Sequence, residues 1–347
     1  MELAIIGCGR IASIHLEAIQ KLRFNLNYII EITSLIDTSL INAELFSKKH
    51  GLSCKIFNNI DDALKNHKFD SVIICVPHMY HENIALKCFK NDINVLLEKP
   101  MAHNIKSAHK ILNNSFKSKK LFMIAENSQY WPEITTVQSL LNQNKIGDIV
   151  TAKASFRQSS SNDIFDSYSL LKGDSDKKAW RYSKEKTGGG ITIDGGAHWI
   201  RPLRLWFGDI SKLVSLFSYP HPNMEGESLS QSILEFKNGF TAIFEGILTE
   251  TTLYSSDYPF RITGKTGEII VGYDGLGVFL FNNENPAGKR ILEDNGYISS
   301  FYHQFKDFYD CIISQTTPQT TAAYSLGEME AALAMEKSNK LNKWIYI

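Results

Sequence analysis

The chain has 347 residues, of which 43% are hydrophobic, and it carries 37 basic and 37 acidic side chains. A chain of this length exceeds the size at which one hydrophobic core usually stops growing, so two domains are expected. The zero formal charge provides no field that attracts nucleic acid or an anionic membrane, which predicts a small molecule as the partner.

The first third of the chain alternates short apolar runs with amphipathic segments of helix length. This alternation is typical of βαβ units and predicts an α/β fold with a doubly wound parallel sheet. Gly51 supplies a stop signal for one of the helices. The expected helices include Ile14–Lys21, Ile41–His50 and His81–Lys90, and the expected strands are Leu3–Ile6, Ile32–Ile36, Lys55–Phe57, Ser71–Val76, Asn94–Leu97 and Leu121–Ala125.

Beyond Trp131-Pro132 the pattern changes to longer alternating segments, which predict a mostly antiparallel, open sheet in an α+β domain. Asn238-Gly239 lies between two such segments and predicts a hairpin with a type I′ turn. Helical periodicity returns over Tyr324–Lys340, and this final helix can pack back on the first domain. The clearest strands are Ile149–Arg157, Ser230–Phe236, Gly239–Ile247 and Glu268–Val271.

A glycine-rich turn follows the first expected strand and precedes the first helix. Its sequence, Gly7-Cys8-Gly9-Arg10-Ile11-Ala12, has the spacing G-x-G-x-x-A of a dinucleotide-binding (Rossmann) turn. Gly7 permits the tight turn, Gly9 lets the backbone approach a pyrophosphate, and Ala12 allows close helix packing. The helix N-terminus favours the phosphate charge, to which Arg10 can add a contact. The alternative is two glycines that only make a sharp turn. We expect residues 1–125 to form this domain and residues 126–347 the second one.

Asp37 ends the second expected strand, where an acidic side chain binds the hydroxyls of the adenine ribose. Its charge repels a 2′-phosphate, so NAD is favoured as cofactor, with NADP possible because Lys48 or Lys49 can approach that phosphate. The alternative is that Asp37 caps the next helix.

Glu98-Lys99-Pro100 ends the fifth strand, at the edge of the sheet where open α/β folds bind ligands. The charge of Lys99 favours an alkoxide-like transition state, and Glu98 can orient it. The alternative is a pair of solvated loop charges.

Asp194 and His198 lie four residues apart, which places them on one face if they share a helix. Histidine suits proton transfer at neutral pH, so His198 is the expected general acid and base, with Asp194 orienting it or binding a neighbouring hydroxyl. The alternative is that Asp194 caps the helix after Gly188-Gly189-Gly190 and that His198 is an interior histidine.

Further candidates surround these residues. Asn127 and Tyr130 follow the sixth strand and can contact cofactor or substrate, while Trp180 and Arg181 can contact a sugar face and an anionic group. Either of the last two can equally be a packing residue. His78 and His81 lack a third ligand at a metal-binding spacing, so no metal is expected.

The ordered set of these motifs resembles the glucose–fructose oxidoreductase and inositol dehydrogenase family. The resemblance implies a Rossmann domain, an α/β domain whose open sheet mediates oligomers, and oxidation or reduction of sugars or cyclitols. It also implies that Pro77 and His81 shape the cofactor pocket. The chain departs from the family at Arg201, where an acidic residue is common; a cation there lowers the pKa of His198 if the two are close, or Arg201 faces a domain interface. The residues that carry the resemblance are Gly7–Ala12, Val76-Pro77 with His81, Glu98-Lys99-Pro100, Ala179-Trp180-Arg181, Gly188–Gly190 and Asp194–His198.

The sequence therefore predicts an NAD(P)-dependent oxidoreductase that transfers a hydride between nicotinamide and a secondary alcohol or ketone of a sugar, cyclitol or related compound. The alternatives are a redox-neutral glycosidase that uses NAD and a non-catalytic nicotinamide sensor. Five cysteines without a CxxC pair and no signal-peptide pattern predict a cytoplasmic protein. A homodimer or homotetramer is expected, without nucleic-acid or membrane partners. The substrate is left open, since it depends on loops near Phe156–Arg181 and after Tyr254.

Overall fold

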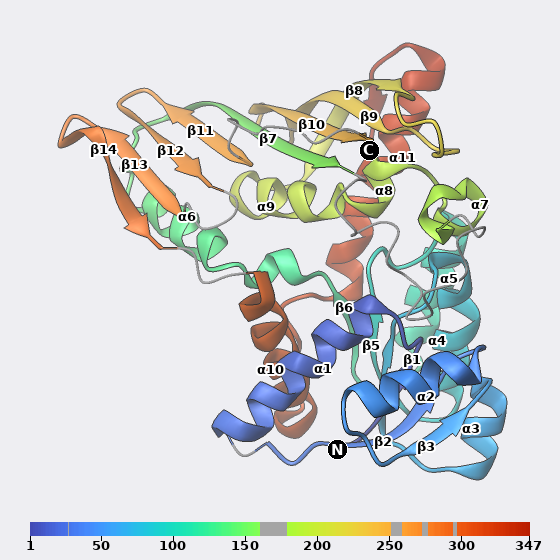
Figure 1. The fold of residues 1–347 in the computed structure, drawn as a ribbon. Helices are drawn as coiled ribbons and strands as arrows, with labels where there is room; N and C mark the ends of the chain where they lie inside the picture. The colour runs from blue at the N-terminus through green and yellow to red at the C-terminus, as the bar shows by residue number, and fades with distance from the viewer. Residues whose placement is uncertain (27, 160–178, 251–258, 273–276, 294–296) are drawn as a thin grey trace. The chain divides into compact units, whose positions relative to one another are not determined.

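A computed structural model describes residues 1–26, 28–159, 179–250, 259–272, 277–293 and 297–347 (Figure 1). The chain divides into two compact units that interleave along the sequence. The first contains the described residues within 1–126, 163–188 and 301–326, and the second those within 127–162, 189–300 and 327–347. The proposed domain ranges, 1–125 and 126–347, stay a prediction.

The first unit contains a six-stranded sheet in the order β3-β2-β1-β4-β5-β6, with every neighbouring pair parallel. This is the strand order of a dinucleotide-binding fold, with its switch point between β1 and β4. The predicted doubly wound sheet is confirmed. Its strands are β1 (Glu2–Ile6), β2 (Glu31–Ile36), β3 (Lys55–Phe57), β4 (Ser71–Ile74), β5 (Asn94–Glu98) and β6 (Phe122–Ala125).

The helices of the first unit follow the strands in βαβ order. Ser39 caps α2 by accepting a hydrogen bond from Asn42 N, and Gly51 follows that helix with φ +62°. Three of these helices, α3, α5 and α7, were not among those named from the sequence; α3 has seven residues and buries only Ile60 and Ala63, too few for a clear period. The helices are α1 (Arg10–Leu26), α2 (Leu40–Lys49), α3 (Ile60–Asn66), α4 (His81–Lys90), α5 (Ile105–Ser115) and α7 (Lys184–Thr187), with short 3₁₀ turns at His78–Tyr80 and Trp180–Tyr182.

The second unit contains a nine-stranded sheet in the order β14-β13-β12-β11-β7-β10-β9-β8-β15. Only β7 and β10 pair in parallel, so the predicted mostly antiparallel sheet is confirmed. The strands are β7 (Ile149–Ser159), β8 (Ile210–Ser218), β9 (Leu229–Phe236), β10 (Thr241–Thr249), β11 (Phe260–Gly264), β12 (Gly267–Val271), β13 (Val278–Asn282), β14 (Asn285–Leu292) and β15 (Ile345–Tyr346).

One face of this nine-stranded sheet is covered by helices, among them α6, α8 and α9 (Figure 1). The strands show the resulting alternation, because β9 buries Leu234 and Phe236 while its neighbour Ile233 is 46% exposed. The remaining helices are α6 (Pro132–Asn142), α8 (Ile191–Asp194) and α9 (Ala197–Phe207) of this unit, α10 (Tyr297–Ser314), most of which belongs to the first unit, and α11 (Ala322–Leu341), with a 3₁₀ turn at Asn127–Tyr130.

The hairpin between β9 and β10 forms where it was predicted, but its turn type differs. Phe236 N donates to Phe240 O at 2.8 Å, and Gly239 N donates to Phe236 O at 2.9 Å. Gly239 has φ +83°, whereas Asn238 does not adopt a positive φ. The loop therefore has three residues with one left-handed position, and the prediction of a two-residue type I′ turn was wrong. The side chain of Asn238 stabilises this form by accepting from Phe240 N and donating to Phe207 O.

A buried ion cluster joins α9 to α11 inside the second unit. Arg201 is fully buried, and its guanidinium donates to Glu328 Oε2 at 2.9 Å. Arg204 binds the other oxygen of Glu328 and also Asp209, at 2.8 Å from Oδ1. Arg204 lowers the pKa of Asp209 through this hydrogen bond. The Glu328 carboxylate thus binds two buried guanidinium groups, one of which also binds Asp209.

Replacing Glu328→Gln is expected to lower the free energy of unfolding by about 3–5 kcal/mol, because it removes the carboxylate that binds both buried guanidinium groups. Chemical denaturation measures this loss. The control is Glu235→Gln, which removes a partner of Lys212 near the surface and should cost less than about 1 kcal/mol. Equal losses in the two variants would contradict the role given to the cluster.

Candidate functional site

The glycine-rich turn has the geometry that its sequence predicts. Gly7 has φ +91°, and a Cβ at this position would lie 2.4 Å from the carbonyl oxygen of Cys75, the residue after β4. Its N–H donates to Ile36 O at 2.8 Å, which ties the turn to the end of β2. No atom lies within 4 Å of the place a Cβ on Gly9 would take, and α1 begins at the next residue. The turn therefore leaves open space beside a helix N-terminus, where an anion is favoured.

Asp37 holds this turn from the neighbouring strand. Its Oδ2 accepts from Cys8 N at 2.8 Å, and its Oδ1 accepts from Ser39 N at 2.8 Å. Ser39, not Asp37, caps α2, so the alternative that Asp37 serves only as a helix cap was wrong. Burial raises the pKa of the adjacent Cys8 thiol, and the nearby Asp37 carboxylate raises it further.

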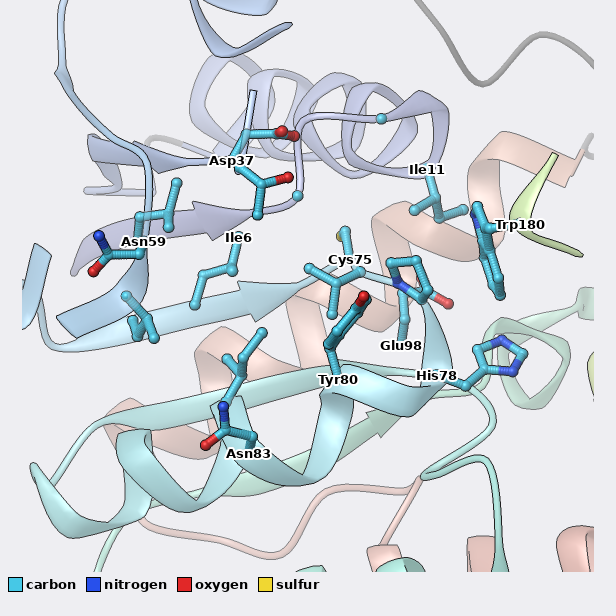
Figure 2. Close-up of a pocket in the computed structure, with 18 of the residues that line it drawn as sticks. Ile6, Ile11, Asp37, Asn59, Cys75, His78, Tyr80, Asn83, Glu98 and Trp180 are labelled. Atoms are coloured by element: carbon cyan, nitrogen blue, oxygen red, sulfur yellow. The ribbon is translucent and has the colours of Figure 1, made fainter. Parts of the chain in front are cut away.

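A cavity of about 490 Å³ lies within the first unit at the carboxyl ends of β1, β2, β4 and β5. Figure 2 shows Asp37 and Asn59 at one end of it and His78, Glu98 and Trp180 toward the other. The predicted site residues that line it are Gly7, Gly9, Arg10, Ile11, Asp37, Val76, Pro77, Glu98, Lys99, Trp180 and Arg181.

Several lining residues at the Asp37 end carry no motif and were missed from the sequence. The side chain of Asn59 caps α3 by accepting from Asp62 N at 2.8 Å, and Asp61 pairs with Lys87 at 2.6 Å. The position of α3 after β3, at the binding edge of the sheet, was the signal that could have indicated them. Lys48 and Lys49 are not among the described lining residues. The lining residues missed from the sequence, at both ends of the cavity, are Ile6, Ile36, Thr38, Asn42, Asn58, Asn59, Ile60, Asp61, Cys75, His78, Tyr80, Asn83, Ile84 and Lys87.

Trp180 and Arg181 belong to the first unit and line the same cavity as the glycine turn. The Arg181 guanidinium lies 4.6 Å from the Trp180 ring centroid, and the His78 ring meets Trp180 edge-on at 4.9 Å. The residues that follow Arg181 pack closely against the rest of the first unit. His78 Nδ1 lies 3.0 Å from Thr187 O, and a Cβ on Gly188 would lie 1.9 Å from His103 O. This segment is thus part of the cavity wall.

His81 and Pro100 lie behind the cavity and do not line it. The buried imidazole of His81 has Nδ1 3.0 Å from Pro100 O and Nε2 2.9 Å from Val76 O. Burial lowers the pKa of His81, so the neutral ring, which has a single N–H, donates to one carbonyl at a time. His81 thereby links the end of β4 to the Glu98-Lys99-Pro100 turn. Ala12 is also fully buried, as a packing residue should be.

Asp194 and His198 belong to the second unit and stand on different helices. Asp194 is the last residue of α8, and His198 is the second residue of α9. The N–H groups of Gly195 and Gly196 both donate to Ile191 O, at 2.8 and 3.0 Å, which ends α8 before α9 begins. The expectation that both side chains share one face of a single helix was therefore wrong. Their joint role stays a prediction.

Glu227 caps the N-terminus of α8. Its carboxylate accepts from Gly190 N at 2.9 Å and from Thr192 N at 3.0 Å. Asp194, at the other end of this helix, cannot cap it, so that alternative was also wrong. Burial raises the pKa of Glu227. His198 is half-buried, with its ring centroid 6.3 Å from that of Trp131.

The remaining candidates of the second unit are buried. Asn127 donates to Ser300 Oγ at 2.8 Å, and Tyr130 is 8% exposed. Arg201, at the position where the family is commonly acidic, donates to Glu328 and to Gln129 Oε1 within the unit. The negative charge of Glu328 therefore balances the positive charge that Arg201 brings to this position. The effect of Arg201 on His198 stays a prediction.

The described part of the chain lacks features of two classes of protein. It contains no group of three or more His, Cys, Asp and Glu side chains that could hold a metal ion. Within the same part, none of the helices combines the length and apolar character that crossing a membrane requires.

Comparison with known proteins identifies the family. Residues 1–126 match the model of the oxidoreductase family with an NAD-binding Rossmann fold, and residues 134–270 match the GFO/IDH/MocA C-terminal domain. The chain belongs to the GFO/IDH/MocA oxidoreductase family. The resemblance stated from the motifs is confirmed.

Two relatives and one solved structure are similar to this chain. Trans-1,2-dihydrobenzene-1,2-diol dehydrogenase of Xenopus tropicalis is 23% identical over 222 residues, which cover 64% of this chain and 62% of the relative. Inositol 2-dehydrogenase/D-chiro-inositol 3-dehydrogenase of Lacticaseibacillus casei is 22% identical, covering 100% of this chain and 94% of the relative. A solved oxidoreductase from Agrobacterium radiobacter, in complex with NAD⁺, L-tartaric acid and magnesium, has a TM-score of 0.84 at 18% identity over 100% of this chain and 98% of that one.

The cavity of the first unit fits the cofactor of this GFO/IDH/MocA fold, NAD. The open space at Gly9 admits a pyrophosphate beside the N-terminus of α1, and Asp37 presents a carboxylate at the end of β2. Both features suit a dinucleotide, whose pyrophosphate is anionic and whose adenine ribose offers hydroxyls to a carboxylate. The sequence-based expectation of NAD as cofactor is confirmed.

The two glycines of the turn should respond differently to alanine. Gly9→Ala is expected to cost less than about 1 kcal/mol of stability, because its Cβ meets no protein atom, yet to weaken NAD binding roughly ten-fold or more by occupying the pyrophosphate space. Gly7→Ala should destabilise the fold itself, given its positive φ and the Cys75 carbonyl. Calorimetric titration and denaturation measure the two effects. Normal NAD affinity in Gly9→Ala would show that the cofactor does not approach this turn.

Proposed function

We propose that the protein is an NAD-dependent dehydrogenase that oxidises a secondary alcohol of a sugar, cyclitol or related hydroxylated ring, or reduces the corresponding ketone. The observation that carries this proposal is one cavity lined by the glycine turn and Asp37 and also by Lys99 and Trp180. The residues suited to binding a nucleotide and the Lys99 ammonium, which can bind a substrate oxygen, therefore line the same cavity.

The residues proposed to hold NAD are those of the turn, Asp37, and the rim formed by Val76, Pro77, Glu98 and Lys99. His81 and Pro100 support that rim from behind, and Asn127 is a further proposed contact. When bound, the nicotinamide ring supplies the hydride acceptor or donor. Because Asp37 is held by two backbone N–H groups, its carboxylate stays in place and disfavours a 2′-phosphate, which supports NAD over NADP.

The proposed chemical roles belong to three side chains. The ammonium of Lys99 stabilises negative charge that develops on the substrate oxygen. The imidazole of His198 takes the hydroxyl proton during oxidation and returns it during reduction. Asp194 orients His198 or binds a neighbouring hydroxyl.

The proposed substrate contacts are Trp180, Arg181 and Tyr130. An indole ring packs against the apolar face of a sugar, and a guanidinium binds a carboxylate or phosphate substituent. The relatives named above act on an inositol and on a cyclic dihydrodiol, which supports a ring with adjacent hydroxyls as the substrate class. Neither relative is named a glycosidase or a sensor, so the two alternative functions gain no support.

An absorbance screen at the nicotinamide band tests the proposal, with NAD and NADP separately, against inositols, free sugars, sugar acids and nucleotide sugars. Activity is expected with NAD. With the active combination of cofactor and substrate, Lys99→Ala and His198→Ala should each lower kcat by roughly 10²–10⁴-fold, while the affinity for NAD falls far less. Unchanged rates in these variants would refute the assigned roles. No absorbance change with any compound, despite NAD binding, would refute the proposal that the protein is a dehydrogenase.

We also propose a homo-oligomer formed through the uncovered face of the nine-stranded sheet. Ile233 and Ile243 lie opposite each other on β9 and β10 and are 46% and 49% exposed; Leu216 on β8 is 63% exposed. Basic and acidic side chains, such as Arg157 and Glu245, flank this apolar strip and permit self-complementary pairing with a second copy. Five free cysteines are consistent with the proposed cytoplasmic location.

The double substitution Ile233→Lys with Ile243→Lys should reduce the mass measured by light scattering to that of one chain, 39.3 kDa, because like charges would meet across the pairing face. Phe116→Lys changes another exposed apolar residue, on the first unit, and should leave the mass unchanged. A monomeric unmodified protein would rule out the assembly.

A further inference from the structure

Glu98 is held at the cavity by a partner on the first helix. His15 on α1 is fully buried, and its Nε2 lies 2.7 Å from Glu98 Oε1. The second carboxylate oxygen, Oε2, accepts from the backbone N–H of Lys99 at 3.2 Å. The Glu98 side chain is 10% exposed, and the residue lines the cavity. An almost buried carboxylate is thus fixed in position at the cavity wall.

The surroundings of His15 indicate which atoms carry protons. Its other ring nitrogen, Nδ1, is buried and has no hydrogen-bond partner. The ring also meets Phe301 edge-on, at 5.2 Å between centroids. A buried N–H without an acceptor is more costly than an unused lone pair, so the neutral tautomer with its proton on Nε2 fits best. His15 then donates to Glu98, and the negative charge of the carboxylate is not cancelled by an imidazolium.

Glu98 lies at the end of the cavity away from Asp37 (Figure 2). Asp37 marks the adenine ribose, and the glycine turn marks the pyrophosphate. The nicotinamide half of the dinucleotide is left for the end lined by Glu98, Lys99 and Trp180. The nicotinamide ring carries a positive charge in NAD⁺ and none in NADH, so a fixed charge here acts differently on the two oxidation states.

We propose that Glu98, positioned by His15, sets the preference of the cavity for the oxidised cofactor. This inference rests on the proposed NAD site. The carboxylate attracts the cationic ring of NAD⁺ and has no such attraction for NADH. Lys99 at the same end acts with the opposite sign. His15 is a positioning residue, because it acts through the carboxylate and does not line the cavity.

Binding without substrate tests this directly. The dissociation constants of NAD⁺ and NADH are measured by calorimetry at neutral pH, and their ratio, NADH over NAD⁺, is compared among variants. Glu98→Gln keeps the shape and removes the charge, and it should lower the ratio by on the order of ten-fold. Lys99→Met should raise it. Glu82→Gln is the matched control: Lys110 lowers the pKa of this carboxyl, which lies outside the cavity, so its loss should change the ratio less than about two-fold.

Two His15 variants test the positioning role. His15→Gln can keep an N–H near the Nε2 position and should retain the ratio of the unmodified protein. His15→Leu removes the donor and should move the ratio toward that of Glu98→Gln. A lowered ratio in both variants would indicate that His15 has a merely structural role. An unchanged ratio in His15→Leu would show that the Glu98 carboxylate does not need its partner.

The outcomes separate this inference from the proposed function. If Glu98→Gln binds both cofactors with an unchanged ratio, or if Glu98→Gln and Lys99→Met shift it in the same direction, the inference fails while the dehydrogenase proposal stands. If the unmodified protein binds neither NAD⁺ nor NADH, the proposed function itself fails.

Discussion

The hydrogen bond from the backbone N–H of Cys8 to the Asp37 carboxylate connects the turn after β1 to the end of β2, two of the strands whose carboxyl ends form the dinucleotide cavity. It fixes the glycine turn against the end of β2, with the contact from Gly7 N to Ile36 O beside it. A charged acceptor makes this bond stronger than a neutral one. The same carboxylate faces the cavity, so one side chain both shapes the turn and presents its charge to a ligand.

The second unit depends on carboxylates in a different way. Glu227 accepts from the first backbone N–H groups of α8, and Glu328 binds Arg201 and Arg204 of α9. Each of these acids comes from a strand-side loop or a helix distant in sequence. The helices that carry Asp194 and His198 are therefore held at their ends and sides by buried charge, while their chemically interesting residues sit at the break between them.

Much of the first unit could be predicted because its signals are local. Gly7, Gly9 and Asp37 lie at the ends of strands whose order follows from the βαβ rule, and the structure places all three on one cavity. The contacts of Trp180 with His78, and of Glu227 with Gly190, join residues far apart in the chain, and no local pattern encodes them. His15 looked like one more polar residue of an amphipathic helix, since its partner Glu98 is 83 positions away. The prediction of a type I′ turn at Asn238-Gly239 failed for another reason. The side-chain hydrogen bonds of Asn238 favour the three-residue turn over the two-residue one.

The close fit of Gly188 against the His103 carbonyl has a bearing on how this fold can be recombined. Residues 179–188 are encoded among segments of the second unit, yet they complete the cofactor wall of the first. A chimera joined after β6 would take the glycine turn from one parent and the cavity-wall residues Trp180 and Arg181 from the other. Exchange of one unit within this architecture therefore requires a crossover at every boundary between the interleaved segments, so that the short wall segment travels with the sheet to which it is fitted.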